Sequence, residues 1–328
     1  MTSTRIHWLD YTKGIGIFLV VLGHTLRAMV NAEILEPSIT VNALDRWIYA
    51  FHMPLFFFIS GLLIEKSSSK PFKKFLIDKL KVIAYPYLLW SVIQSILTIA
   101  ASKYTNHKMS WGELSRILYN PVMQFWFLYV LFIIVLAYAI ARKLNMSPEV
   151  FLGCCIVGLI LKGFHVSLGT WGVLYLVREF AIYLGIGAAI GSKLDLEKLR
   201  QIPTFILLGM SSTGFILVGL AVQFNLTGQL FTQPVFAMLG SMATIALAIL
   251  MERFHLFSFI KEWGTLSMAI YLIHTIASAL FRTILLKIFG IEDPIFHLII
   301  QTFVGLYIPV FIYIICVKCR FSYIFRWP

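Results

Sequence analysis

The sequence predicts an all-α integral membrane protein, a polytopic bundle of about ten transmembrane helices with both termini in the cytoplasm. Three observations predict it: 59% of the 328 residues are hydrophobic and only 13% are charged, long apolar runs recur along the chain, and basic residues gather on alternate connections. An average soluble domain has about 45–50% apolar and about 25% charged residues. The composition therefore excludes a soluble enzyme, a disordered protein and a secreted disulfide scaffold.

The apolar runs have the length of membrane spans, which need about 20 mostly apolar residues. The predicted spans are 11–31, 45–65, 80–101, 124–142, 150–164, 172–190, 203–223, 233–251, 264–286 and 295–317. The fifth is short and contains three glycines. The runs are continuous rather than alternating, which excludes membrane-spanning strands. Because the longest polar stretch, 102–123, is too short for a soluble domain, residues 1–328 are predicted to form one transmembrane domain.

The basic residues predict the orientation of the chain. With a cytoplasmic N-terminus, the termini and inner connections hold 18 Lys and Arg residues, and the outer connections hold six. Lys and Arg are enriched in cytoplasmic loops, so both termini are predicted to face the cytoplasm, with the protein in the inner cell membrane. The net charge of +12 then indicates contact with anionic lipid rather than nucleic acid.

The cysteines give no metal site. Cys316 and Cys319 form a C-V-K-C run that resembles half of a zinc motif. A second Cys/His pair at zinc spacing would be needed to complete it, and the sequence offers none. We therefore expect no bound metal.

Polar residues lie along one face of the first span. Lys13 and His24 are eleven residues apart, which is within about 20° of three helical turns, so both side chains share a face about 16 Å apart along the axis. Asp10 and Arg27 fall near the same stripe. This face predicts a charged site at the cytoplasmic mouth and an imidazole deeper in the membrane. The simpler alternative is that Lys13 pairs with Asp10 on an exposed helix end.

Other intramembrane polar residues lie on later spans. His52, on the second span, is predicted at about the depth of His24, and Pro54 favours an irregular segment beside it. His274 lies near the middle of the ninth span, and the neighbours Arg178 and Glu179 are in the sixth. Because consecutive helical residues diverge by about 100°, we expect Arg178 and Glu179 each to have a partner on another helix.

Two motifs resemble the opening of the acyltransferase-3 family, closest to its fucose-4-O-acetylase-like membrane acetyltransferases. They read L-D-Y-T-K-G-I-G-I-F-L-V-V-L-G-H at 9–24 and F-H-M-P-L-F-F-F-I-S-G at 51–61. Weaker matches follow in order at 73–74, 85–91, 125–128 and 264–274. The resemblance covers the chain from end to end, and about ten spans fit the family.

The resemblance implies an O-acyltransferase that moves an acetyl group from cytoplasmic acetyl-CoA, a co-substrate rather than a permanent cofactor, to a hydroxyl of a cell-surface carbohydrate. It places His24 at the catalytic position and Lys13 where the family commonly has arginine. Lysine keeps that charge but loses the bidentate geometry of a guanidinium.

Residue chemistry agrees with this expectation. His24 can act as base for the hydroxyl or as acyl acceptor, with His52 beside it, and Lys13 and Asp10 lie at the expected donor mouth. Arg27, His52 or Trp126 can supply a hydrogen bond to the oxyanion. The remaining candidates for the acceptor site are Arg178, Glu179 and His274. The main alternative is a glycan or lipid-linked sugar transporter, since intramembrane charges also line substrate pathways.

Overall fold

The computed structural model describes residues 5–100 and 110–327, and within these ranges it contains helices and no strands. The longer helices are α1 (His7–Asn31), α2 (Ile39–Ser68), α4 (Tyr85–Ala100), α6 (Trp126–Lys143), α7 (Pro148–Gly163), α8 (Val173–Gly191), α9 (Thr204–Gln223), α10 (Thr232–Arg253), α12 (Ser267–Lys287) and α13 (Pro294–Lys318). The shorter ones are α3 (Phe72–Lys79), η1 (Leu80–Ala84), α5 (Trp111–Leu114), η2 (Met123–Phe125), η3 (Leu196–Gln201), α11 (Ser258–Thr265) and η4 (Ser322–Ile324).

The helices follow the predicted spans closely and confirm a polytopic helical membrane protein. In the described ranges, nine helices are long and apolar enough to cross a membrane, counting Phe72–Ala100 and Met123–Lys143 as one each. The fifth predicted span is the helix α7, which has 16 residues and is shorter than the other nine. The orientation of the termini stays a prediction.

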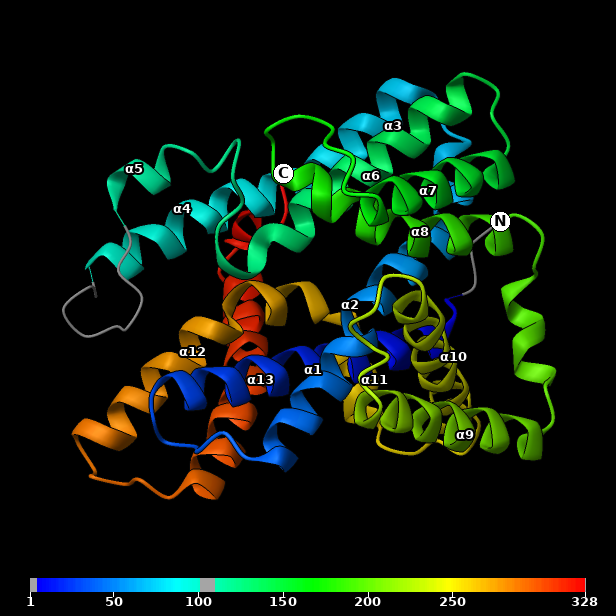
Figure 1. Cartoon of the computed structure of the whole chain (residues 1–328). Helices are drawn as coiled ribbons and strands as arrows, with labels where there is room; N and C mark the ends of the chain where they lie inside the picture. The colour runs from blue at the N-terminus through cyan, green and yellow to red at the C-terminus, as the bar shows by residue number, and fades with distance from the viewer. Residues whose placement is uncertain (1–4, 101–109, 328) are drawn as a thin grey trace. The chain divides into compact units, whose positions relative to one another are not determined.

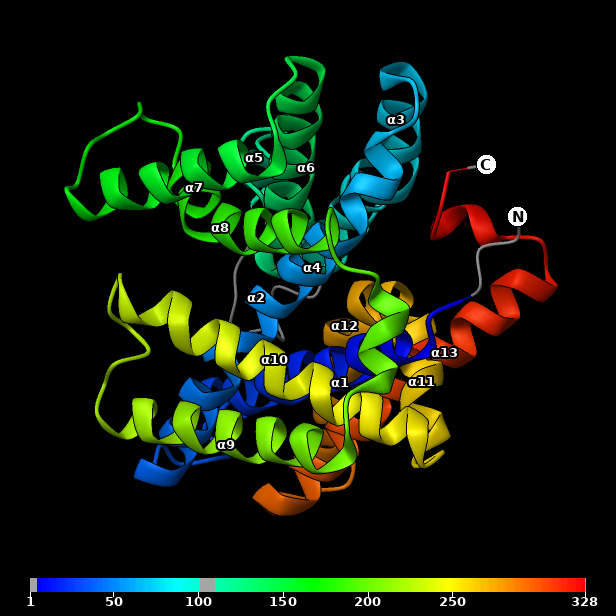
Figure 2. The same cartoon turned by 90° about the vertical axis from the view of Figure 1, so that its right-hand side faces the viewer.

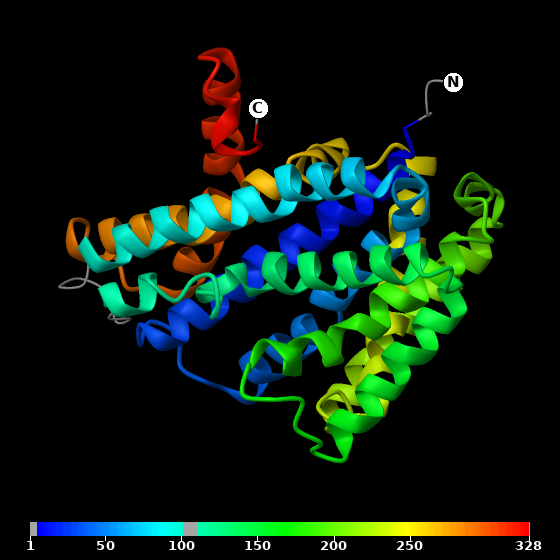
Figure 3. The same ribbon diagram turned by 90° about the horizontal axis from the view of Figure 1, so that it is seen from above.

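Two local expectations change in the structure. The irregular segment expected beside Pro54 is absent, because α2 runs through this proline as one 30-residue helix. The basic connection before the third span is largely helical, since α3, η1 and α4 follow one another without a break (Figure 3). The π-helical turn η1 ends just before Pro86, which lacks a backbone N–H, and a local π-helical adjustment can satisfy backbone groups that a proline leaves unpaired in a membrane helix.

The chain divides into two compact units. The first combines residues 1–56 with 195–319, and the second combines 57–194 with 320–328. The boundary on the N-terminal side falls inside the helix α2. A single transmembrane domain over 1–328 stays a prediction.

In the first unit, α1 is the central helix. It packs against α10, α11, α12 and α13, while α9 packs on α10 and α12 on α13 (Figures 1 and 2). The apolar core of the first unit includes the buried residues Leu19 and Leu26 of α1 and Ile48 and Phe51 of α2. The histidines of the first two spans are therefore held on helices that are fixed by apolar packing.

The second unit contains the C-terminal half of α2 and the helices α3 to α8. Here α7 packs against α8, and α6 packs against α8 and against η1. Phe57 at the start of this unit stacks on Phe180, with 5.0 Å between the ring centres.

Candidate active site

Three histidines and Tyr49 form one chain of ring contacts in the first unit. The ring centres of His24 on α1 and His274 on α12 are 5.2 Å apart. Tyr49 on α2 lies 6.4 Å from His24 and 4.6 Å from His52, in edge-to-face geometry with both. His52 and His274 are each only 1% exposed, and His24 is half-buried. The structure therefore brings together His24, His52 and His274.

Backbone carbonyls fix the orientation of two of these rings. Nδ1 of His52 is 2.8 Å from the carbonyl oxygen of Ile48, and Nδ1 of His274 lies within 3.0 Å of two carbonyl oxygens of its own helix. A carbonyl oxygen only accepts, so Nδ1 carries the proton, and Nε2 of the neutral ring carries the lone pair. Nε2 of His274 is buried and has no hydrogen-bond partner among the described residues. Both rings therefore present an acceptor rather than a donor to the site.

Arg27 is held by two residues of α2 that we did not single out in the sequence. Its Nε and Nη2 donate to the two carboxylate oxygens of Asp45 at 2.7 and 2.9 Å. Its guanidinium carbon lies 3.2 Å from the ring centre of Tyr49. The ion pair is partly solvent-exposed, with 49% exposure for the Arg27 side chain and 22% for that of Asp45. Arg27 is therefore part of a defined contact and does not simply extend towards the membrane surface.

A sequence signal for Asp45 and Tyr49 existed. Asp45, Tyr49 and His52 are spaced by four and then three residues, so they lie on one face of α2. This face of α2 indicates a polar site because it carries a carboxylate at the start of an apolar span and a histidine further along. Of these three residues, only His52 is among the site residues predicted from the sequence.

At the other end of α1, Asp10 pairs with Arg5 and not with Lys13. Nε of Arg5 is 2.7 Å from a carboxylate oxygen of Asp10. The hydrogen bond and the negative charge of Asp10 raise the pKa of the Arg5 guanidinium above its usual value. Lys13 is half-buried and makes no ion pair within the part of the chain that is described. The pairing of Lys13 with Asp10 that we considered as the simpler alternative is therefore wrong.

Glycines bring α11 against this end of α1. A Cβ on Gly264 would overlap the backbone carbonyl of Asp10, and a Cβ on Gly14 would overlap the carbonyl of Ile260. The two helices thus approach at backbone distance directly beside Lys13. This contact fixes the height and rotation of α1, and with them the placement of the Lys13 side chain.

The other predicted residues lie in the second unit. Glu179 of α8 forms an ion pair of 2.7 Å with Lys162 of α7, whose ammonium also lies 4.0 Å from the ring centre of Tyr175. Arg178 donates from Nη1 to the carbonyl of Val166 at 2.6 Å. Glu179 thus has its partner on another helix, as predicted, whereas Arg178 binds a carbonyl of the connection between α7 and α8.

Trp126, the remaining candidate, begins α6 in the second unit. Its ring centre lies 5.0 Å from that of Phe180, within an aromatic cluster that also contains Phe127. These contacts are those of a packed aromatic side chain.

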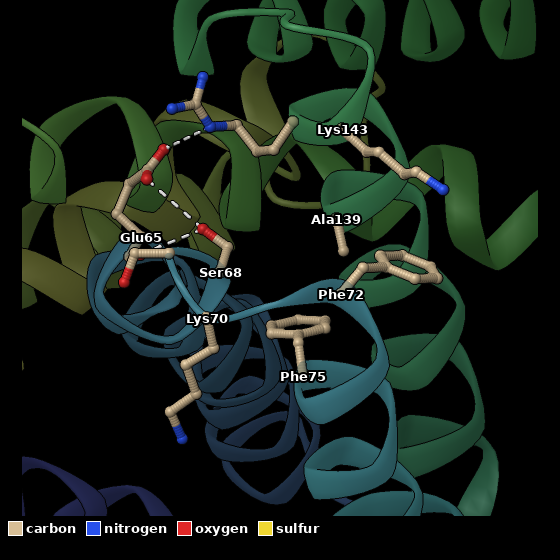
Figure 4. Close-up of a pocket in the computed structure, with 9 residues that line it drawn as sticks. Glu65, Ser68, Lys70, Phe72, Phe75, Ala139 and Lys143 are labelled. Atoms are coloured by element: carbon tan, nitrogen blue, oxygen red, sulfur yellow. Dashed lines mark hydrogen bonds and ion pairs between the residues drawn. The ribbon is translucent and has the colours of Figure 1, made fainter.

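The second unit also contains a small basic pocket of about 270 Å³ (Figure 4). Its lining includes Glu65 at the end of α2, Lys70, and Arg142 and Lys143 at the end of α6. Nε of Arg142 is 3.0 Å from Glu65, and Lys70 is paired with Asp78 at 2.8 Å. Because carboxylates already neutralise two of the three cations, we assign no ligand to this pocket.

Comparison with known proteins gives a match over nearly the whole chain. The model of the acyltransferase domain family matches residues 6–317. Nodulation protein NolL of Sinorhizobium fredii is 33% identical over 93 residues, which is 28% of this chain and 25% of that protein. Nodulation protein NolL of Mesorhizobium japonicum is 28% identical over 133 residues, which is 40% of this chain and 35% of that protein.

The chain therefore matches only about a quarter to a third of the length of these curated relatives. No solved structure matches it significantly. The family match includes both units of the structure and contains α1, α2 and α12, which carry the three histidines. The motifs of the first two spans, the polytopic helical fold and this match agree, and the chain belongs to the acyltransferase-3 family of membrane proteins.

Proposed function

We propose that the protein is a membrane O-acetyltransferase that moves the acetyl group of cytoplasmic acetyl-CoA to a hydroxyl of a cell-surface sugar or polysaccharide. The observation that carries the proposal is the histidine cluster, in which His24 lies 5.2 Å from His274 and shares Tyr49 with His52. The family match favours an acyltransferase over the transporter that intramembrane charges alone also allow.

The cluster suits the activation of a hydroxyl. A sugar hydroxyl is a weak nucleophile until a base accepts its proton, and a neutral imidazole does this near pH 7. We assign this role to His24, as a base or as an acyl acceptor that later passes the acetyl group on. His52 and His274 support it with acceptor nitrogens, because their Nδ1 protons already point to backbone carbonyls. These nitrogens can hold the acceptor hydroxyl or an N–H of His24.

The donor would bind at the end of α1 that is predicted to be cytoplasmic. Coenzyme A carries several phosphate charges, and Lys13 is a half-buried ammonium without an ion-pair partner in the described ranges. Its separation from His24 along the helix, about 16 Å, has the scale of the pantetheine arm. Phosphates at Lys13 would therefore place the thioester near His24. Asp10, engaged with Arg5, contributes by shaping this mouth.

The test measures acetyl transfer to the glycan of the cell itself. Membranes with the wild-type protein are incubated with acetyl-labelled acetyl-CoA and surface glycan purified from cells that lack the gene. We expect alkali-labile label in the glycan. His24→Ala should lower its rate by about 10²–10⁴-fold, the usual effect of removing a general base, and His52→Ala should also be severe.

His297→Ala is the matched control, measured per folded protein. His297 is buried in the same unit, but its Nε2 contacts the carbonyl of Ile291 and its Nδ1 contacts Gln301, so its role is structural. Transfer at the wild-type rate by His24→Ala would disprove the assignment. Loss of the glycan from the surface of deletion cells, with its acetyl content unchanged, would identify a transporter instead.

A further inference from the structure

The proposed reaction requires a hydrogen-bond donor that the three histidines do not supply. When a nucleophile attacks a thioester, negative charge develops on the carbonyl oxygen, and a preorganised donor stabilises it. His52 and His274 donate through Nδ1 to backbone carbonyls, so their remaining nitrogens are acceptors. His24 is occupied as base or nucleophile. The first unit must provide this donor from another side chain.

Arg27 is poorly placed for this task. Its Nε and Nη2 are used by Asp45, and its guanidinium plane rests on Tyr49. The guanidinium thus orients the tyrosine ring and also interacts with its hydroxyl, and because a guanidinium only donates, the O–H of Tyr49 can still donate to another group.

The phenol of Tyr49 has the required properties. Its hydroxyl oxygen is buried, and no group among the described residues accepts its O–H, which is costly for a polar group unless a ligand completes it. Its ring lies between His24 and His52, at 6.4 and 4.6 Å. Gly23, directly before His24, allows this approach, because a Cβ there would lie 3.0 Å from the ring of Tyr49.

We propose that the hydroxyl of Tyr49 donates the hydrogen bond that stabilises the oxyanion during acetyl transfer. The inference rests on the acetyltransferase function proposed above. The attacking atom, either the acceptor oxygen with its proton passing to His24 or a nitrogen of His24, forms a bond to the carbonyl carbon. The π electron pair moves onto the carbonyl oxygen, which accepts the O–H of Tyr49. Collapse of this intermediate breaks the carbon–sulfur bond, and the coenzyme A thiolate leaves with a proton from the imidazolium of His24. In the acyl-histidine route the acceptor oxygen then attacks the acetyl group, the bond to the His24 nitrogen breaks, and the released imidazole takes the hydroxyl proton.

Arg27 and Asp45 act on this reaction as positioning residues. The guanidinium lies 3.2 Å from the ring centre of Tyr49, a close cation–π contact, and the bidentate pair with Asp45 fixes its plane. A cation on the ring face also draws electron density from the phenol and strengthens its O–H as a donor. Loss of Asp45 should weaken this effect without removing the hydroxyl.

The experiment compares Tyr49→Phe with the wild type in the acetyl-transfer assay, with the affinity for acetyl-CoA measured separately on the same purified protein. Loss of one oxyanion donor typically lowers kcat by about 10²–10³-fold. We expect that loss for Tyr49→Phe, with acetyl-CoA affinity changed by less than about 3-fold, since the hydrogen bond forms only as charge develops. A packing defect would instead reduce the folded fraction or the affinity.

Tyr183→Phe is the matched control, because Tyr183 is a buried tyrosine of α8 in the second unit, and we expect wild-type turnover from it. Asp45→Asn is a second variant. We expect its kcat to fall by about 10-fold with unchanged acetyl-CoA affinity, a loss that corresponds to roughly one charge-assisted hydrogen bond. It tests the inference even if Tyr49→Phe does not fold.

The outcomes separate the two proposals. Suppose that the wild type transfers acetyl and His24→Ala does not. Turnover by Tyr49→Phe within about 3-fold of the wild type would then overturn the role of Tyr49 and leave the proposed function intact. If Tyr49→Phe does not fold, the same result for Asp45→Asn would have this meaning. Absence of transfer by the wild type overturns both.

Discussion

The imidazole of His24 on α1 lies 5.2 Å from that of His274 on α12, measured between ring centres. The two residues are far apart in the sequence, and the contact forms because both helices pack on each other in the first unit. His274 donates from Nδ1 to its own helix, and its Nε2 is buried without a partner in the part of the chain that the structure describes. This orphan acceptor beside His24 makes His274 a member of the site.

The first prediction concerns that nitrogen. His274→Asn keeps an N–H near Nδ1 but removes the acceptor at Nε2, whereas the longer side chain in His274→Gln places an amide oxygen near it. If the acceptor supports His24, the asparagine variant should lose about 10²-fold in acetyl transfer, and the glutamine variant should lose less. Initial rates with labelled acetyl-CoA distinguish them. Equal rates in both variants and the wild type would make His274 a packing residue.

The second prediction tests the donor anchor. Lys13→Ala should weaken acetyl-CoA binding by roughly 10- to 150-fold, because charge-assisted hydrogen bonds contribute about 1.5–3 kcal/mol. Lys13→Arg should retain binding. Asp10→Ala removes the partner of Arg5 rather than a partner of Lys13, so it should weaken binding less than Lys13→Ala does. Calorimetric titration of the detergent-purified proteins gives the affinities, and equal values for all four would remove Lys13 from the donor site.

The third prediction concerns the close contact of α1 with α11. Gly264→Ala should destabilise the protein by about 1–3 kcal/mol, since its Cβ would overlap the carbonyl of Asp10 and one helix must move. Gly209→Ala in α9 is the control, with no atom within 4 Å of its added Cβ. In a helix this control should be neutral or slightly stabilising. Thermal unfolding in detergent compares Gly264→Ala with Gly209→Ala, and similar melting temperatures for both variants would contradict the close contact of α1 with α11.

The fourth prediction concerns the ion pair between Lys162 and Glu179, whose side chains are 7% and 18% exposed. Removing one partner of a buried pair leaves an uncompensated charge and costs about 3–5 kcal/mol, whereas replacing both with apolar residues is often neutral. Lys162→Met alone should therefore lower stability far more than Lys162→Met combined with Glu179→Leu. Unfolding free energies from a double-mutant cycle measure the coupling. Additive losses would mean that the pair does not stabilise the fold.

The fifth prediction concerns topology. We expect reporter fusions after residues 70, 143, 195 and 257 to face the cytoplasm, and those after 106 and 228 to face outside. The fusion after 143 and one after 167 decide whether α7, with 16 residues, crosses the membrane. Opposite locations give ten spans and two cytoplasmic termini. Identical locations give nine spans and place the termini on opposite sides.

The sequence alone determined the fold class and the positions of the helices. Lipid offers no hydrogen-bond partners, so each span must satisfy its backbone as a helix, and continuous apolar runs locate it to within a few residues. The α1 face that carries Lys13 and His24 follows from helical geometry, because both residues lie on one continuous helix. These features are local, and a local pattern is sufficient to predict them.

Only the tertiary structure decided which polar groups meet. The ring of His274 contacts that of His24, Asp45 holds Arg27 over Tyr49, and Asp10 takes Arg5 as its partner. Such pairings depend on the rotation and height of one helix against another. Side-chain packing and close approaches such as Gly14 and Gly264 against backbone set these quantities, and contacts between distant segments leave no periodic signal in either segment.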